Sequence, residues 1–326
     1  MKYIIYLLFL FTSSHSYAQI STISATDGSI LITPRGLLGK TNTSSTSNVA
    51  LGTDALKNNT TGSNNTANGA YSLNANTTGN NNSANGHFAL YSNTTGSLNT
   101  ANGVSSLRSN TTGTDNTANG ALSLWANTTG LNNTANGAFS LRFNTTGNDN
   151  STNGRNSLFS NTTGYNNTAN GAYSLNANTT GNNNSANGHF ALYSNTTGSE
   201  NTANGASSLR SNTTGSQNTA NGAYSLYLNT TGNNNSVNGF NSLSSNTTGS
   251  GNTAIGSYAD VSTTNLTNAT VIGSSAVVNA SNKVRIGNAS VTVIEGQVAW
   301  SFPSDRRLKE NIIVNNNLGL NFINKL

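Results

Sequence analysis

Few side chains in this 326-residue sequence have the types and spacing that could support chemistry. His87 and His189 could ligate a metal ion, but they are 102 residues apart, which is six times a 17-residue spacing. If successive 17-residue units stack at the strand spacing of a β-sheet, the two imidazoles lie about 29 Å apart and cannot share one metal. We therefore expect surface histidines, no metal site and no cofactor.

Acidic residues and Asn offer two further kinds of chemistry. Asp and Glu together number 9, too few for the carboxylate-rich loops of calcium-binding repeats. Asn-Thr-Thr, an N-glycosylation acceptor pattern, recurs along the chain from Asn59 onward, but it also arises from any turn sequence rich in Asn and Thr. The sequence contains no carboxylate pair, metal-binding cluster or phosphate-binding loop that would indicate an enzyme acting on an outside substrate.

These residues belong to a strict 17-residue repeat, Asn-Thr-Thr-Gly-x-x-Asn-Thr-Ala-Asn-Gly-x-x-Ser-Leu-x-x, which is clearest over 59–75. The tetrad recurs without insertion and begins at Asn59, Asn76, Asn93, Asn110, Asn127, Asn144, Asn161, Asn178, Asn195, Asn212, Asn229 and Asn246. Such a period indicates one structural unit stacked on itself. Asn, Thr and Gly are poor helix formers, and Gly interrupts each unit twice. We predict an all-β fold, a parallel β-solenoid with one 17-residue coil per unit.

One Leu occupies the same position in each unit. A disordered polar segment would have no reason to keep an apolar residue in phase, so this regularity argues against disorder. This Leu ladder comprises Leu73, Leu90, Leu107, Leu124, Leu141, Leu158, Leu175, Leu192, Leu209, Leu226 and Leu243. We expect it to form the interior. A large residue often stands two positions before the Leu, as at Tyr71 and Phe88. If this segment is a strand, that residue faces the same side as the Leu.

A second ladder is polar. Asn precedes the second Gly of every inner unit, from Asn68 to Asn238 at 17-residue intervals, whereas the equivalent residues at the two ends are Leu51 and Ile255. Stacked Asn side chains can hydrogen-bond to one another along a ladder, so such a row can be buried. The sequence leaves open whether it faces the interior, a subunit interface or solvent.

Two binding functions gain little support from the sequence. Ice binding needs a flat Thr lattice, but the adjacent Thr60 and Thr61 point to opposite faces if they are extended. A net charge of +5 raises nucleic-acid binding, which requires a continuous basic stripe. The arginines of the repeat fall singly on different units, at Arg108, Arg142, Arg155 and Arg210. We therefore expect no nucleic-acid partner.

The N-terminus has the features of a secretory signal peptide. Met1–Gln19 contains Lys2, an apolar run over 3–11 and a small-residue cleavage site at 16–18. The apolar run is too short for a membrane span. We predict cleavage after Ala18 and a secreted or cell-surface protein. Because the chain has no Cys, its fold outside the cell must depend on stacking and oligomerisation rather than disulfides.

Val-Ala-Leu-Gly (49–52), Thr-Ala-Ile-Gly (253–256) and Thr-Val-Ile-Gly (270–273) resemble the head repeat of trimeric, YadA-like autotransporter adhesins. The resemblance covers about 48–287. It implies a left-handed parallel β-roll in which three chains pack side by side, with an unknown surface, glycan or protein as the receptor. The inner repeats depart from that family, because they carry Asn for Ile or Leu and have 17 residues rather than a shorter coil.

The C-terminal segment resembles a second family. Ser304-Asp-Arg-Arg-Leu-Lys-Glu-Asn-Ile312 and then Leu318–Leu326 are similar to the start of the intramolecular chaperone domain of endosialidase-type phage tail spikes, a self-cleaving peptidase family. The resemblance implies assisted trimerisation and cleavage of the Pro303–Ser304 bond, with Ser304 as nucleophile and Lys309 as its activating partner. On one continuous helix these two side chains would point about 140° apart. Contact therefore requires a non-helical Ser304 or a lysine from a neighbouring chain.

The predicted organisation has five parts. They are a signal peptide at 1–19, a cap or lead-in at 20–47, the repeat β-roll at 48–256, a transition or stem at 257–303, and a truncated start of the chaperone domain at 304–326. Within the stem we expect a shorter coil step ending at 284–287 and short β-type runs at 291–294 and 297–300.

The predicted function is an exported homotrimeric fibre that displays the β-roll for surface attachment. The alternatives are a self-processing protein whose peptidase activity is confined to its own chain, and a passive structural spacer. No membrane-spanning anchor is expected within the chain.

Overall fold

The computed structural model describes residues 47–297, which belong to two units. The first unit extends to Asn288 and contains every strand found in the described residues, while the second begins at Ala289. The expected signal peptide, lead-in and chaperone segment lie outside the described residues.

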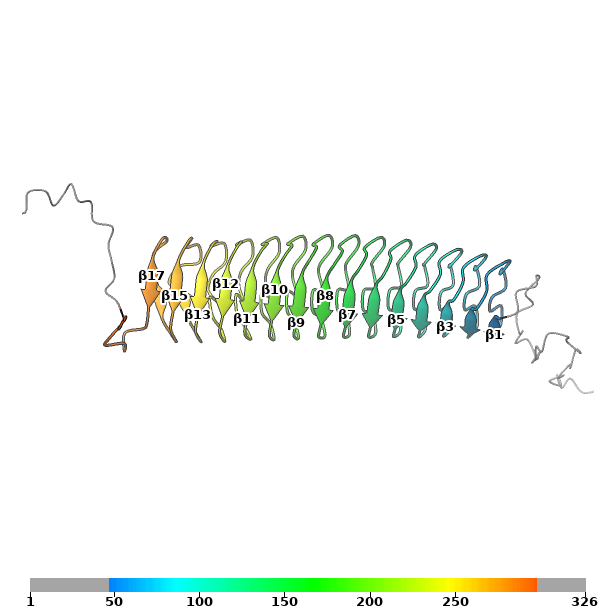
Figure 1. The fold of residues 1–326 in the computed structure, drawn as a ribbon, viewed down its shortest axis with the longest axis horizontal. Helices are drawn as coiled ribbons and strands as arrows, with labels where there is room; N and C mark the ends of the chain where they lie inside the picture. Colours follow the sequence, from blue (N-terminus) through cyan, green and yellow to red (C-terminus); the bar gives the residue numbers. More distant parts are fainter. Residues whose placement is uncertain (1–46, 298–326) are drawn as a thin grey trace, which may run out of the picture. The chain divides into compact units, whose positions relative to one another are not determined.

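The first unit is a stack of coils, each of which adds one short strand to a growing sheet (Figure 1). Thirteen strands follow one another as β1 (Val49–Leu51), β2 (Thr66–Asn68), β3 (Ser83–Asn85), β4 (Thr100–Asn102), β5 (Thr117–Asn119), β6 (Thr134–Asn136), β7 (Ser151–Asn153), β8 (Thr168–Asn170), β9 (Ser185–Asn187), β10 (Thr202–Asn204), β11 (Thr219–Asn221), β12 (Ser236–Asn238) and β13 (Thr253–Ile255). The sheet continues through β15 (Thr270–Ile272) and β17 (Val284–Ile286), whereas β14 (Asp260–Val261) and β16 (Val277–Val278) form a second, two-stranded sheet. The described residues contain no helix, and the predicted parallel β-solenoid is confirmed.

Pairing between coils is parallel and keeps the repeat in register. Thr134, for example, pairs with Ser151, its equivalent 17 residues later. The last step is shorter, because Thr270 pairs with Val284, 14 residues later, as the sequence predicts. The main sheet has 15 strands, and at about 4.8 Å per strand it extends roughly 67 Å.

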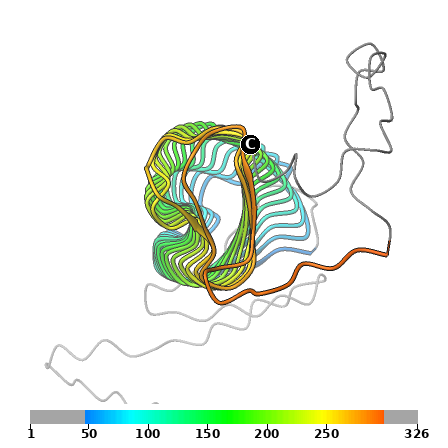
Figure 2. The same ribbon diagram turned by 90° about the vertical axis from the view of Figure 1, so that its left-hand side faces the viewer.

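Seen along the stack, the coils nearly superpose, so equivalent side chains form ladders (Figure 2). The Leu ladder is fully buried, as predicted, and the middle residues of the main-sheet strands from β1 to β15, most of them Ala, form a second buried ladder in the interior. Burial of one Leu per coil is the main apolar contribution to stability, at about 1.5–3 kcal/mol for each side chain.

The remaining interior is amide rather than hydrocarbon. Two Asn ladders are buried, one from the first residue of Asn-Thr-Thr-Gly and one from the residue before each strand. In the first ladder Asn76 Nδ2 donates to Asn59 Oδ1 at 2.8 Å and to Gly79 O at 3.0 Å. In the second, Asn82 Nδ2 donates to Asn65 Oδ1 at 3.1 Å. Because these amides are bonded from coil to coil, the polar interior is largely satisfied.

The segment around each Leu is not a strand, so the expected alternation of side chains is wrong there. Every second residue is left-handed, with φ of 59° at Tyr71 and 48° at Leu73. The Tyr71 N–H donates to Thr53 of the preceding coil, and the Leu73 N–H donates to Ala89 of the following coil. This backbone lacks the pleat of a β-strand, and Leu73 is buried while Tyr71 is only half-buried.

The corner after each inner strand requires Gly. Gly137 has φ of 127°, and a Cβ built on it would lie 2.7 Å from the carbonyl carbon of Gly154 in the next coil. A side chain there is both strained and obstructed by backbone.

The second unit does not contain the strand that we expect at 291–294. Residues 291–296 have no regular secondary structure and are exposed. A strand needs a partner, and the main sheet ends at β17. The other expected run, 297–300, lies almost entirely outside the described residues.

Candidate binding surfaces

The first surface is the outer sheet face, formed by the first and third residues of the strands in the main sheet. In β6 the middle residue Ala135 is fully buried, while Thr134 and Asn136 point away from the interior and are half-exposed. Each inner coil repeats this arrangement, so the face carries a Thr/Ser column beside an Asn column. The Asn ladder that begins at Asn68 therefore lies outside the roll interior.

Hydrogen bonds join the outer Asn side chains from coil to coil, as the sequence predicts. Asn85 Nδ2 donates to Asn102 Oδ1, and the series continues through Asn119 to Asn136 at 2.8 Å for each bond. A second series links Asn170, Asn187, Asn204 and Asn221 at 2.8–2.9 Å. The two series flank β7, where Thr152 replaces the usual Ala. Each series is consequently regular and pre-ordered.

Both ends of the outer sheet face are apolar. Val49 and Leu51 of β1 are 54% and 44% exposed, and at the other end Ile255 is 47% and Val284 64% exposed. Large exposed apolar residues at the two ends of one regular face are typical of a protein contact surface.

The second surface is a column of residues that directly follow the Leu ladder. We call it the arginine–aromatic column; it comprises Tyr91, Arg108, Trp125, Arg142, Phe159, Asn176, Tyr193, Arg210 and Tyr227. Arg108, Arg142 and Arg210 all belong to it, although they are scattered along the sequence. Only the 17-residue phase brings them into line, and the signal in the sequence is that each of the three immediately follows a ladder Leu.

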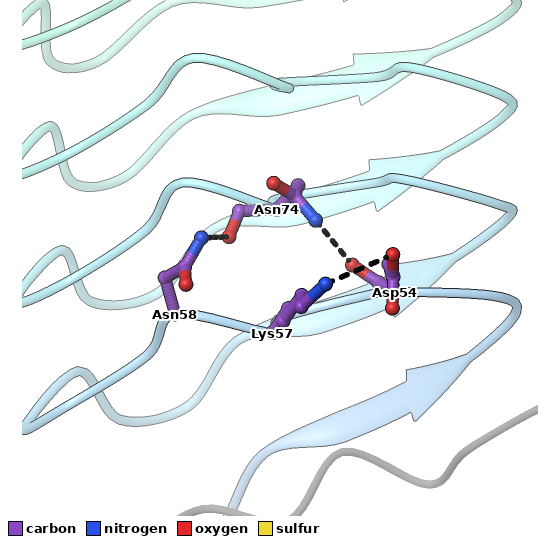
Figure 3. A network of polar contacts seen from close by, with 4 residues as sticks. All are labelled: Asp54, Lys57, Asn58 and Asn74. Atoms are coloured by element: carbon purple, nitrogen blue, oxygen red, sulfur yellow. Dashed lines mark hydrogen bonds and ion pairs between the residues drawn. The ribbon is translucent and has the colours of Figure 1, made fainter.

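The first coil begins this column differently. Lys57 occupies the equivalent position and forms an ion pair of 3.2 Å with Asp54 (Figure 3). The next coil supplies Asn74, whose Nδ2 donates to the Asp54 carbonyl oxygen at 2.8 Å, and Asn58 Nδ2 donates to the Asn74 carbonyl oxygen at 3.0 Å (Figure 3). The N-terminal end of the column is thus neutralised locally.

The residues singled out for chemistry are not assembled into one site. His87 and His189 are exposed on separate coils, and the described residues contain no group of three or more His, Cys, Asp or Glu that could hold a metal. The Asn of each inner Asn-Thr-Thr is buried; the Asn76 amide nitrogen, for example, donates to Asn59 Oδ1 of the preceding coil and to Gly79 O of its own coil. Folded coils therefore do not present it for glycosylation. Ser304, Lys309 and the Pro303–Ser304 bond lie outside the described residues.

A single chain wound into ladders of Leu, Ala and Asn defines the class of protein, a parallel β-solenoid. A scan against protein-family models and a search of curated proteins both find no match. Among the described residues there is no helix long and apolar enough to cross a membrane.

Proposed function

We propose that this chain is an exported, rod-shaped fibre protein whose β-solenoid serves surface attachment. The observation that supports this proposal best is the unbroken stack of nearly identical coils, which presents the same side chains at fixed intervals. A repeated display of this kind suits attachment along a length better than catalysis in one pocket.

We further propose that three copies pack side by side through the outer sheet face. The apolar residues at its two ends, Leu51 and Ile255, would then be buried between copies, and the Asn columns would lie beside one another. A thin single roll has little interior of its own, so this contact would add apolar burial that the monomer lacks.

Light scattering of the full chain tests this assembly. We expect a particle of three times the chain mass, and we expect Ile255→Asp to lower that mass because the contact would have to bury a charge. Leu98→Glu is the matched control, since Leu98 is exposed on a different column and Glu200 stands at the equivalent position six coils later. A monomeric wild-type chain would contradict the assembly.

Asn136→Asp provides a second test in the middle of the same face. If the outer Asn row is covered by sister chains, the new carboxylate is desolvated, and the melting temperature of the assembled protein falls. An unchanged melting temperature would place the row in solvent and argue against this interface.

Self-processing is a separate part of the proposal and rests on the C-terminal motif alone. The Ser304 hydroxyl would attack the Pro303 carbonyl carbon while Lys309 accepts the hydroxyl proton, and the Pro303–Ser304 C–N bond would break as that proton passes to the Ser304 nitrogen, which leaves as an amine. Water would then hydrolyse the ester between Pro303 and the Ser304 oxygen to a free carboxylate and the Ser304 hydroxyl. Mass spectrometry of the complete gene product should show a cut before Ser304 that Ser304→Ala abolishes. Equal cutting in Ser304→Ala, or an intact wild-type product, would remove this role.

A second candidate function is ice binding by the outer sheet face. The observation that favours it is the two-column array of Thr/Ser and Asn on this face. The array is formed by the first and third residues of the strands and not by Thr60 and Thr61, the pair considered from the sequence. Thermal hysteresis should then be present in the wild type and lost in Thr134→Tyr, with Thr129→Tyr, which is exposed on another column, as the control. Ice binding and the proposed trimer exclude each other, because a face covered by sister chains cannot contact ice.

A further inference from the structure

The arginine–aromatic column alternates two kinds of side chain on successive coils. From Tyr91 to Phe159 the order is aromatic, Arg, aromatic, Arg, aromatic, and after Asn176 it resumes as Tyr193, Arg210 and Tyr227. Arg108 and Arg142 are two coils apart, or about 9.6 Å, and Arg210 follows four coils later at about 19 Å. Positive charge therefore recurs along one line at multiples of two coils.

Each guanidinium in the column is held against aromatic rings. Arg142 has its guanidinium carbon 5.7 Å from the Trp125 ring centre, 5.1 Å from that of Phe143 and 5.9 Å from that of Phe159. Its Nε is buried and has no hydrogen-bond acceptor among the described residues. Cation–π contacts therefore hold this guanidinium against the rings, and because its Nε is buried, an external anion would contact its Nη groups.

The same arrangement occurs twice more, around Arg108 and Arg210. Arg108 lies 4.9 Å from the Phe88 ring centre and 5.9 Å from that of Tyr91. Arg210 lies 4.9 Å from the Phe190 ring centre, and its Nη1 donates to Tyr227 Oη at 3.0 Å. Three pre-ordered guanidinium groups thus stand in one column.

No carboxylate neutralises these arginines. The ion pair between Lys57 and Asp54 is the only one among residues 47–297. The acidic residues of the inner coils occupy another column, the second position after Asn-Thr-Thr-Gly, at Asp115, Asp149 and Glu200. Positive and negative charges are therefore separated onto different columns, and the arginines are available to an external anion.

The ligand must match this alternation. An extended polymer with an acidic group on every second unit can place a carboxylate or sulfate at each guanidinium, which binds such groups through paired N–H donors. Its intervening units would then lie beside the aromatic side chains that hold the guanidinium groups. We propose that the arginine–aromatic column binds a linear acidic polysaccharide that lies along the solenoid. This inference deepens the proposed attachment function, because it names the class of ligand.

Single-stranded nucleic acid fits the column less well. Proteins that bind it stack bases on free aromatic faces and track a phosphate at every nucleotide. Here Arg142 lies between Trp125 and Phe159 and covers a face of each, and the column carries a charge only on alternate coils at most. Alternating sugar units match this spacing better than successive bases.

Calorimetric titration of the full chain with hyaluronan oligosaccharides, which carry a carboxylate on every second sugar, tests the proposal. We expect binding that weakens with salt, and a loss of about tenfold or more in affinity for Arg108→Gln/Arg142→Gln. Lys283→Gln, which removes an exposed charge away from the column, should bind as the wild type does. Arg142→Lys should bind more weakly than the wild type, because an ammonium lacks the planar pair of donors.

Two further probes complete the experiment. Equal affinity for carboxyl-reduced hyaluronan, or no binding by the folded chain, would overturn the proposal. Tighter binding of oligo-dT would replace it with nucleic-acid recognition. Light scattering on the same samples tests the proposed trimer independently of polysaccharide binding. A monomer that binds hyaluronan would contradict the trimer but not the polysaccharide site.

Discussion

At the scale of single residues, the Leu ladder combines deep burial with a costly backbone. Leu141 is fully buried and has φ of 50°, a left-handed conformation that branched or bulky residues rarely adopt. Such a residue costs on the order of 1–3 kcal/mol and persists only when its surroundings enforce it. The burial of Leu against the Leu of adjacent coils offsets this cost.

We expect Leu141→Ala to lower the free energy of unfolding by about 2–5 kcal/mol, because it leaves a cavity in the narrow interior. Urea denaturation followed by circular dichroism measures the effect. Leu131→Ala, at an exposed position ten residues earlier, should change the midpoint little. Equal effects of the two substitutions would show that the Leu ladder is not the core.

The inner Asn ladders should tolerate charge poorly. Asn144 Nδ2 donates to Asn127 Oδ1 at 2.8 Å and to Gly147 O at 2.9 Å, and the residue is fully buried. Asn144→Asp removes both donors and places a carboxylate against two acceptors, at a cost of about 3–5 kcal/mol when it is ionised. Burial would raise the pKa of this carboxyl, so the loss should be smallest at acid pH and grow as the pH rises.

Thermal melts of Asn144→Asp at pH 4 and pH 7 check both the size and the direction of this effect. Asn81→Asp is the control, because Asn81 is exposed and acidic residues already stand at its equivalents Asp115 and Asp149. A wild-type melting temperature for Asn144→Asp at neutral pH would contradict the bonding pattern of the inner ladder.

At the scale of the element, the last coils change the repeat at Asp260. This residue occupies the Leu ladder position 17 after Leu243 and begins β14. Burial raises the pKa of the Asp260 carboxyl, partly opposed by hydrogen bonds from the Val261 N–H at 2.8 Å and from Ser245 and Ser244. A raised folded-state pKa means that the ionised form opposes folding.

The contribution of Asp260 to stability is therefore fully present below the unfolded-state pKa of about 3.8 and is lost as the pH rises through the higher folded-state pKa. Asp260→Asn should remove this pH dependence. The free energy of unfolding of the variant, measured relative to that of the wild type, should therefore be higher at pH 7 than at pH 3.5. Urea midpoints of the two proteins at both pH values provide the comparison. A constant difference between them would show that Asp260 titrates normally.

At the scale of the whole molecule, stability should depend on coil number rather than on any one coil. Deletion of residues 110–126 removes one complete unit and joins Ser109 to Asn127, which preserves every ladder. We expect a folded protein that unfolds cooperatively and is shorter by about 4.8 Å. The fold should tolerate the deletion because each coil contacts only its neighbours, so the two flanking coils can stack on each other.

Small-angle scattering and thermal melting measure the two effects of this deletion. Deletion of residues 110–125 is the control, since it leaves one extra residue that the coil must accommodate outside the ladders. The 16-residue deletion should melt at a lower temperature than the 17-residue deletion. The reverse order would contradict a fold built on strict register.

The sequence by itself determined the class of fold. A strict 17-residue period with Leu in phase permits one stacked coil per unit, because only equivalent residues in adjacent coils can keep every ladder in register. It also predicted the side-chain bonds of the outer Asn row and the shorter step before Val284. These features depend on contacts between equivalent positions, which periodicity alone specifies.

The tertiary structure decided which way each ladder faces. The alternate left-handed residues around Leu73 separate Tyr71 from the interior, and no rule of strand alternation reveals them. Burial of Asn76 and Asn82 follows from bonds to carbonyl groups whose positions depend on the shape of the closed coil. The alignment of Arg108, Arg142 and Arg210 follows likewise from the phase of each residue within the coil. The path of the whole coil in space sets the direction of each side chain. The spacing of residues along the chain does not specify that path.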